Sequence, residues 1–124
     1  MAVPLAGRTC RPCEGGIQPL PAAAAKRLLE DVREWELIDG KAIRKTLKCK
    51  DFMDAVDLIQ KIAPLAEAEG HHPDFHLTNY RKLAIELSTH AIGGLSENDF
   101  ILAAKIDQLL RDGSHFPGGQ SAGK

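Results

Sequence analysis

Apolar residues recur at steps of three and four positions in three segments of the chain, the spacing with which a helix buries one face. These segments predict helices over residues 21 to about 32, 51 to 69 and 96 to 112. Pro21 suits the first turn of a helix, and Asp51 is a good N-cap. Ser96 opens the third segment in a capping box with Asp99. Pro64 lies inside the second segment and predicts a kink, unless the missing hydrogen bond faces solvent.

Apolar and polar residues alternate in two further stretches, with the period that is typical of half-buried strands. The first runs from Glu36 to Cys49 around Asp39-Gly40, a dipeptide that accepts the positive φ angles of a tight turn. The second runs from Phe75 to Leu87 around a polar turn near residues 79–81. Each stretch therefore predicts an antiparallel hairpin.

The predicted elements follow the order α-β-β-α-β-β-α, without the repeated βαβ units of a parallel sheet. This order predicts an α+β fold, a four-stranded antiparallel sheet with three helices packed on one face. Such a sheet leaves two edges and one open face, which favours an oligomer. The 124 residues suit one domain, which we place at 21–112, after a flexible N-terminal arm over 1–20 and before a disordered C-terminal tail over 113–124.

The charge balance excludes several classes of partner. Sixteen Lys and Arg against seventeen Asp and Glu give a formal net charge of −1, which offers no basic field for nucleic acid.

No run approaches the ~18 apolar residues of a membrane span, and no secretory leader pattern is present, so we expect a soluble, cytoplasmic protein. Cys10 and Cys13 form at most half of a zinc site, because no second pair follows at a suitable spacing. We therefore expect no metal.

Four of the five histidines lie between residues 71 and 90, on the second predicted hairpin. If its turn is centred on the polar segment, partner residues have numbers that sum to about 160, so 70–72 lie opposite 88–90. His71, His72 and His90 then converge at one end of the hairpin. A pair of imidazoles can supply one proton donor and one acceptor, as a dehydration requires. Since neighbours in an extended segment point to opposite faces, His71 and His72 are poorly placed to share a metal ion.

Other residues near this end have both a structural and a functional interpretation. Asp99 caps a helix and can also orient His90, because that helix begins just after this histidine. Glu67 lies on a helix face that solvent covers, or it contacts a ligand. Trp35 fills the core or provides a platform for a planar ligand.

Three segments have a distinctive sequence: His-His-Pro-Asp-Phe at 71–75, Leu-Ser-Thr-His at 87–90 and Gly-Leu-Ser-Glu-Asn-Asp at 94–99. With Glu67 before them and Tyr80 between them, they resemble in order and spacing the signature of the pterin-4a-carbinolamine dehydratases, also called dimerisation cofactor of a homeodomain transcription factor. Trp35 agrees with the family sequence too. The resemblance covers about residues 20–111, and the lead-in at 10–16 resembles that of bacterial members.

The resemblance implies a lyase that removes water from 4a-hydroxytetrahydropterin and gives quinonoid dihydropterin, in recycling the pterin of the aromatic amino acid hydroxylases. It implies no metal and no organic cofactor, because the pterin is the substrate. His71 and His90 are the implied acid and base, in an order that the sequence leaves open, and His72 is the third histidine of the catalytic group and chiefly binds substrate. The implied substrate-binding residues are Gly70, His71, His72, Pro73, Ser88, Thr89, His90 and Ala91.

The same resemblance implies supporting roles for other side chains. Asp99 would support His90, and Glu67 would make a polar contact near the pterin. Phe75 stands where many members carry Trp, so an aromatic wall is kept and an indole donor is lost. Gly70 stands where some members carry Asp. Both departures concern the affinity for substrate rather than the type of reaction.

A second hypothesis belongs to a different class of protein. The chain would be a non-catalytic oligomeric interaction module, or a transcriptional cofactor, that docks a regulatory partner through its second helix and the sheet edge. The three site histidines favour the enzyme, because docking does not need them. A homodimer or a homotetramer is expected in either case.

Overall fold

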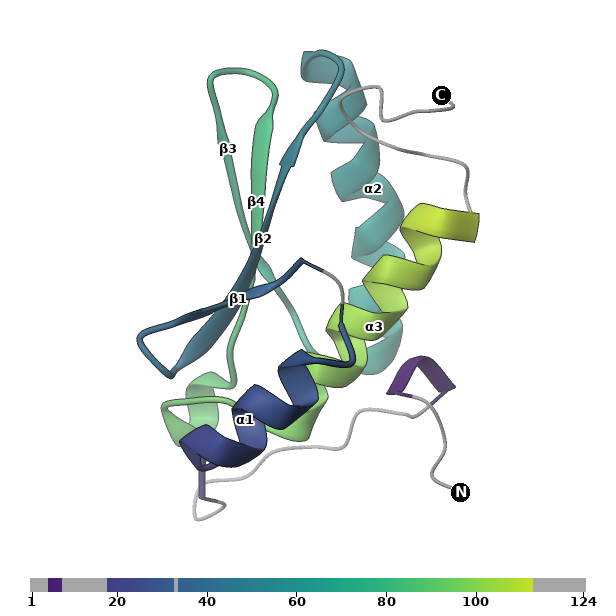
Figure 1. Cartoon of the computed structure of the whole chain (residues 1–124). Helices are drawn as coiled ribbons and strands as arrows, with labels where there is room; N and C mark the ends of the chain where they lie inside the picture. Colours follow the sequence, from purple (N-terminus) through teal and green to yellow (C-terminus); the bar gives the residue numbers. More distant parts are fainter. Residues whose placement is uncertain (1–4, 8–17, 33, 113–124) are drawn as a thin grey trace.

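The computed structural model describes residues 5–7, 18–32 and 34–112 of the chain. In this part of the chain the helices are α1 (Ala22–Leu29), α2 (Phe52–Glu69) and α3 (Glu97–Asp112), with short 3-10 turns η1 (Leu5–Gly7) and η2 (His90–Ile92). The strands are β1 (Glu36–Ile38), β2 (Ala42–Lys48), β3 (Asp74–Thr78) and β4 (Lys82–Leu87). They form one antiparallel sheet in the order β1-β2-β4-β3, and the α-helices lie together on one side of it (Figure 1). The predicted α+β fold and element order are confirmed.

The ends of α2 show why this segment is a helix. The Asp51 side chain accepts a hydrogen bond of 2.8 Å from the backbone N–H of Asp54, which satisfies one of the free donors of the first turn. Gly70 ends the helix in the left-handed conformation, with φ of 66°. The helix continues through Pro64, whose side chain is exposed. The missing backbone hydrogen bond is therefore tolerated on the solvent side.

Both hairpins form where the alternation predicts them. Asp39 and Gly40 have φ of 53° and 70°, and Asn79 and Tyr80 have φ of 49° and 55°, so each turn uses the left-handed region. Along β3 and β4 the partner residues have numbers that sum to 160, as in the pair Asp74 and Glu86. The predicted register is confirmed.

The core lies between the sheet and the helices. Its largest fully buried apolar side chains come from β2, β4, α2, α3 and the segment before α3: Ile43, Leu58, Ile62, Leu83, Ile85, Leu87, Leu95, Phe100, Leu102 and Ile106. Leu5 of η1 is buried as well and packs in the same cluster. Residues 1–4 and 8–17 of the predicted arm, which include Cys10 and Cys13, lie outside the described residues, as does the predicted tail over 113–124. None of the described helices combines the length and the apolar character that crossing a membrane needs.

One charged pair lies inside this core. Lys45 occupies the core-facing position between Ile43 and Leu47 on β2, and its side chain is only 7% exposed. Its Nζ lies 3.2 Å from Oδ1 of Asp107 on α3, which also accepts a hydrogen bond of 3.0 Å from Nε1 of Trp35. The structure therefore supports the core-filling interpretation of Trp35.

A buried thiol gives a prediction about reactivity and pH. Burial, together with the nearby carboxylates of Asp54 and Asp51, raises the pKa of Cys49 from its ordinary value of 9.0 to about 11. At pH 8 we expect Cys49 to react with iodoacetamide at least about a hundredfold more slowly in the folded protein than in urea, because the thiolate is the nucleophile. Peptide mass spectrometry measures this rate at Cys49 separately from Cys10 and Cys13. Equal rates in the two states would contradict the prediction.

The same shift fixes the sign of the pH effect on stability. The folded thiol holds its proton more tightly than the unfolded thiol. The contribution of Cys49 is therefore fully present below about pH 9 and is lost as the pH rises toward 11.

Candidate active site

The site lies where four elements end or begin: α2 ends, β3 starts, β4 ends and α3 starts. The left-handed Gly70 turns the chain out of α2, and the backbone N–H of His71 donates to the carbonyl of Ala66 over 3.2 Å. After β4, Thr89 pairs with Gly94 in an isolated bridge that closes the short loop containing η2. This closure brings Thr89 next to the first turn of α3.

A fully buried carboxylate is the centre of the site. Oδ1 of Asp99 lies 2.6 Å from Nε2 of His71. Its other oxygen, Oδ2, accepts hydrogen bonds from the Thr89 hydroxyl at 2.8 Å and from the backbone N–H of Ser96 at 3.0 Å. Because the single hydroxyl hydrogen of Thr89 goes to Asp99, the Ser96 hydroxyl donates to Thr89 across their 2.7 Å contact. The carboxylate is thus held rigidly on both oxygens.

The Asp99 contact fixes the chemistry of the His71 ring. An ionised carboxylate only accepts hydrogen bonds, so Nε2 donates and Nδ1 is the nitrogen left to exchange a proton. The side chain of His71 is 11% exposed, so it reaches solvent over a small area. A histidine oriented by a buried carboxylate is an arrangement suited to general acid–base chemistry.

Asp99 pairs with His71 and not with His90, the histidine that we expected it to support. The reason is the direction of the chain after β4. Thr89 is extended, with φ of −109° and ψ of 97°, and its side chain points inward to Asp99. Its neighbour His90 therefore points outward, with 78% of its side chain exposed and Nε2 at 4.0 Å from Oδ2 of Asp74.

His72 lies on the other side of the chain from His71, as expected for neighbours in an extended segment. Its Nε2 is 3.0 Å from Oε1 of Glu67, and both side chains are largely exposed. The structure thus pairs two of the predicted site residues at the rim. An ion pair so open to solvent contributes at most about 1 kcal/mol to stability.

The remaining predicted residues lie around these pairs. Pro73 and Ser88 are half-buried, at the ends of β3 and β4 respectively, and Ala91 is exposed on η2. Phe75 is partly buried on the core side of β3, opposite Ile85. In the described part of the chain, no three His, Cys, Asp or Glu side chains are grouped as ligands of one metal ion.

Two contacts were missed by sequence reasoning. Ser96 was predicted only as a helix cap, although its hydroxyl also bonds Thr89. Asp74 was not singled out, although its position directly after the His-His-Pro segment and opposite the end of β4 could have indicated a partner for His90. Together with the fold, this geometry defines a class of protein: a small α+β domain with histidines grouped around a buried carboxylate at one end of its sheet.

Comparison with known proteins identifies the family. The sequence model of the family described as pterin 4 alpha carbinolamine dehydratase matches residues 18–109. The chain belongs to this family, as the resemblance predicted, and is therefore assigned to the dehydratases, which are lyases that remove water.

Individual relatives agree with this assignment. The chain is 46% identical over 112 residues to a protein of Methylococcus capsulatus that is provisionally named a pterin-4-alpha-carbinolamine dehydratase, covering 90% of this chain and 97% of the relative. It is 42% identical over 109 residues to the mitochondrial pterin-4-alpha-carbinolamine dehydratase 2 of Arabidopsis thaliana, covering 85% of this chain and 58% of the relative. A crystal structure of a transcriptional coactivator/pterin dehydratase from Brucella melitensis is similar in fold, with a TM-score of 0.67 and 29% identity over 74% of this chain and 98% of that one.

Proposed function

We propose that this dehydratase acts on pterin-4a-carbinolamine by acid–base catalysis, with His71 as the base and His90 as the acid. The observation that carries this assignment is the 2.6 Å contact between Nε2 of His71 and the buried Asp99 carboxylate. Such a carboxylate stabilises the imidazolium that forms when the free nitrogen takes a proton. The carboxylate beside His90, that of Asp74, is 55% exposed, and the exposed His90 ring can exchange protons with water between turnovers.

The proposed reaction needs no reactant or cofactor beyond the pterin and the two histidines. His90 gives a proton to the leaving 4a-hydroxyl. The bond between that oxygen and the ring carbon breaks, and its electron pair leaves with the water molecule. His71 removes the proton from the ring atom next to this carbon, and the electron pair that held the proton forms the new double bond of quinonoid dihydropterin. In this proposal the pterin is the substrate, and neither a metal nor an organic cofactor takes part.

The proposed substrate position lies between the two histidines. Gly70, Pro73 and the segment 88–91 form its walls, and Phe75 provides an apolar surface at its base. His72 and Glu67, 3.0 Å apart at the rim, hold polar edges of the pterin. An exposed pair suits a binding role, because it can exchange its mutual contact for contacts with a ligand.

The test is the rate of quinonoid dihydropterin formation from freshly generated 4a-hydroxytetrahydropterin, measured from pH 5 to 9. We expect the wild type to accelerate the reaction, with a rate that falls on both sides of neutrality because base and acid need opposite protonation states. His90→Ala should lower kcat by about 10²-fold or more. His76→Ala is the matched control, since His76 is an exposed histidine on the same hairpin whose Nε2 lies 3.9 Å from Glu86. No acceleration by the wild type would contradict the proposal.

The physiological part of the proposal is tetrahydropterin recycling in the cytoplasm, beside an aromatic amino acid hydroxylase. The proposal also includes a homodimer or homotetramer. β1 and β3 are the outer strands of the sheet, through which copies of the chain could pair. The name of the Brucella protein combines a dehydratase with a transcriptional coactivator, which keeps the interaction module as the alternative. A pull-down with and without pterin separates a function that depends on the site from one that depends on the surface.

A further inference from the structure

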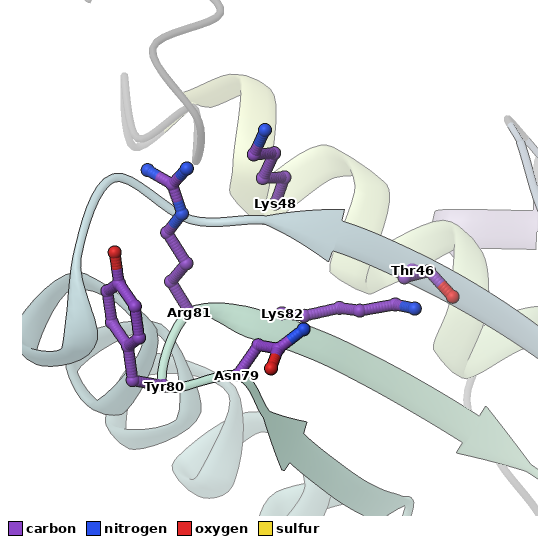
Figure 2. Close-up of a pocket in the computed structure, with 6 residues that line it drawn as sticks. All are labelled: Thr46, Lys48, Asn79, Tyr80, Arg81 and Lys82. Carbon is purple, nitrogen blue, oxygen red and sulfur yellow. The ribbon is translucent and has the colours of Figure 1, made fainter.

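A cavity of about 470 Å³ opens at the turn between β3 and β4, lined by Thr46, Lys48, Asn79, Tyr80, Arg81 and Lys82 (Figure 2). It is separate from His71 and His90. Lys82 begins β4 and Thr89 follows its end, so at ~3.3 Å per residue the two places are roughly 20 Å apart. A cavity of this size is in the range that small ligands occupy, about 300 to 1,000 Å³.

The cavity is lined by positive charge. Three of its side chains are cations, and none of its lining residues is an acid. Lys48 and Lys82 are direct cross-strand partners, an arrangement in which like charges repel. Among the described residues, neither ammonium group has a hydrogen bond or an ion pair, so the repulsion is not relieved within the described part of the protein. An anion bound in the cavity would reduce it.

The third cation is held in place by the turn. Tyr80 has φ of 55°, a conformation that is uncommon for a bulky side chain, and it remains 60% exposed. The guanidinium carbon of Arg81 lies 5.8 Å from the centre of the Tyr80 ring, and Nη1 donates to the carbonyl of Lys50 at 3.5 Å. In Figure 2 the Arg81 and Tyr80 side chains rise side by side from the turn. The turn thus presents a guanidinium and an aromatic wall together.

We infer that this cavity is a second ligand site, which binds a small anion carrying a phosphate group. Arginine presents a planar fork that matches phosphate oxygens, and two lysines add the charge that a dianion needs. A nucleic-acid strand does not fit the surroundings. Glu86 and Asp74 lie farther along the same sheet face, Asp51 and Asp54 flank the start of α2, and the chain has a net charge of −1.

The test titrates inorganic phosphate, inorganic pyrophosphate and phenyl phosphate into the full-length protein at low salt, while NMR follows the Tyr80 ring. We expect saturable shifts, with affinity reduced about tenfold in Lys82→Gln and in Arg81→Gln because each removes a charged hydrogen-bond donor. Lys41→Gln is the matched control, since Lys41 is an exposed lysine in the turn at the other end of the sheet. Tighter binding of phenyl phosphate identifies a phosphorylated aromatic molecule as the ligand, and equal binding identifies the free ion.

Two results would overturn the inference: shifts that do not saturate, or the same loss of affinity in Lys41→Gln as in Lys82→Gln. The dehydratase assay on the same variants keeps this inference separate from the proposed function. Lys82→Gln should retain the wild-type rate, because the cavity lies at the opposite end of β4 from His71 and His90.

Discussion

Replacing His71 by alanine is expected to lower kcat for the dehydration by about 10²- to 10⁴-fold, the range that a positioned acid or base contributes. His71 is the histidine whose ring the protein orients, through Nε2 and the buried Asp99 carboxylate. His76→Ala should change kcat little. The rate is measured under saturating substrate, and circular dichroism checks that each variant is folded. A His71→Ala variant with the wild-type kcat would contradict the assignment of the base.

Asp99→Asn separates the chemistry of His71 from the packing around it. An asparagine amide fills the same volume and can still accept from Thr89 and Ser96, but toward His71 it presents N–H donors. Nε2 would then have to accept, which moves the ring proton to Nδ1 and removes the base. We expect a loss in kcat similar to that of His71→Ala, with KM less affected. If Asp99 acted only as a helix cap, kcat would stay at the wild-type level.

Truncating Lys45 to alanine is expected to destabilise the fold by about 3 to 5 kcal/mol, the effect of removing one partner from a buried ion pair. The Asp107 carboxylate, only 5% exposed, would lose the Lys45 ammonium that lies 3.2 Å from its Oδ1. Urea unfolding followed by Trp35 fluorescence measures the change. The effect should appear in the midpoint rather than in the slope of the transition.

Two variants show whether the charge is the cause of this loss. Lys61 and Asp57 form an exposed pair one helical turn apart on α2, with side chains 43% and 50% exposed. Lys61→Ala should change stability by less than about 1 kcal/mol. The double variant Lys45→Met with Asp107→Asn should recover most of the loss, since it removes both charges and keeps an amide oxygen that can accept from Trp35. A double variant as unstable as Lys45→Ala would instead point to packing.

The fold was predictable because its signals are local. The Asp39-Gly40 turn, the Asp51 cap and Gly70 each act within a few residues, and the alternation around Asn79 was sufficient to set the register that the structure has. That residues 70–72 lie near residues 88–90 was predictable for the same reason, since register decides which segments lie opposite each other.

Contacts between distant segments were not predictable in this way. The choice of His71 over His90 as the partner of Asp99 depends on Thr89 pointing inward, which the loop closure at Gly94 decides. Lys45 lies in phase with the apolar residues of β2, and this alternation could have indicated a buried lysine, although no such prediction was made. However, its counter-ion on α3 follows from how the helix packs on the sheet, which a periodic pattern does not specify.

Asp99 serves two structures at once, since one oxygen caps the first turn of α3 and the other holds His71. His71, the proposed base, is therefore oriented only in molecules in which α3 is docked with its first turn intact. Partly unfolded molecules that retain the β3–β4 hairpin would carry the same histidines without the carboxylate that directs them. Dehydratase activity should thus report the docking of α3, and it should be lost in step with global unfolding.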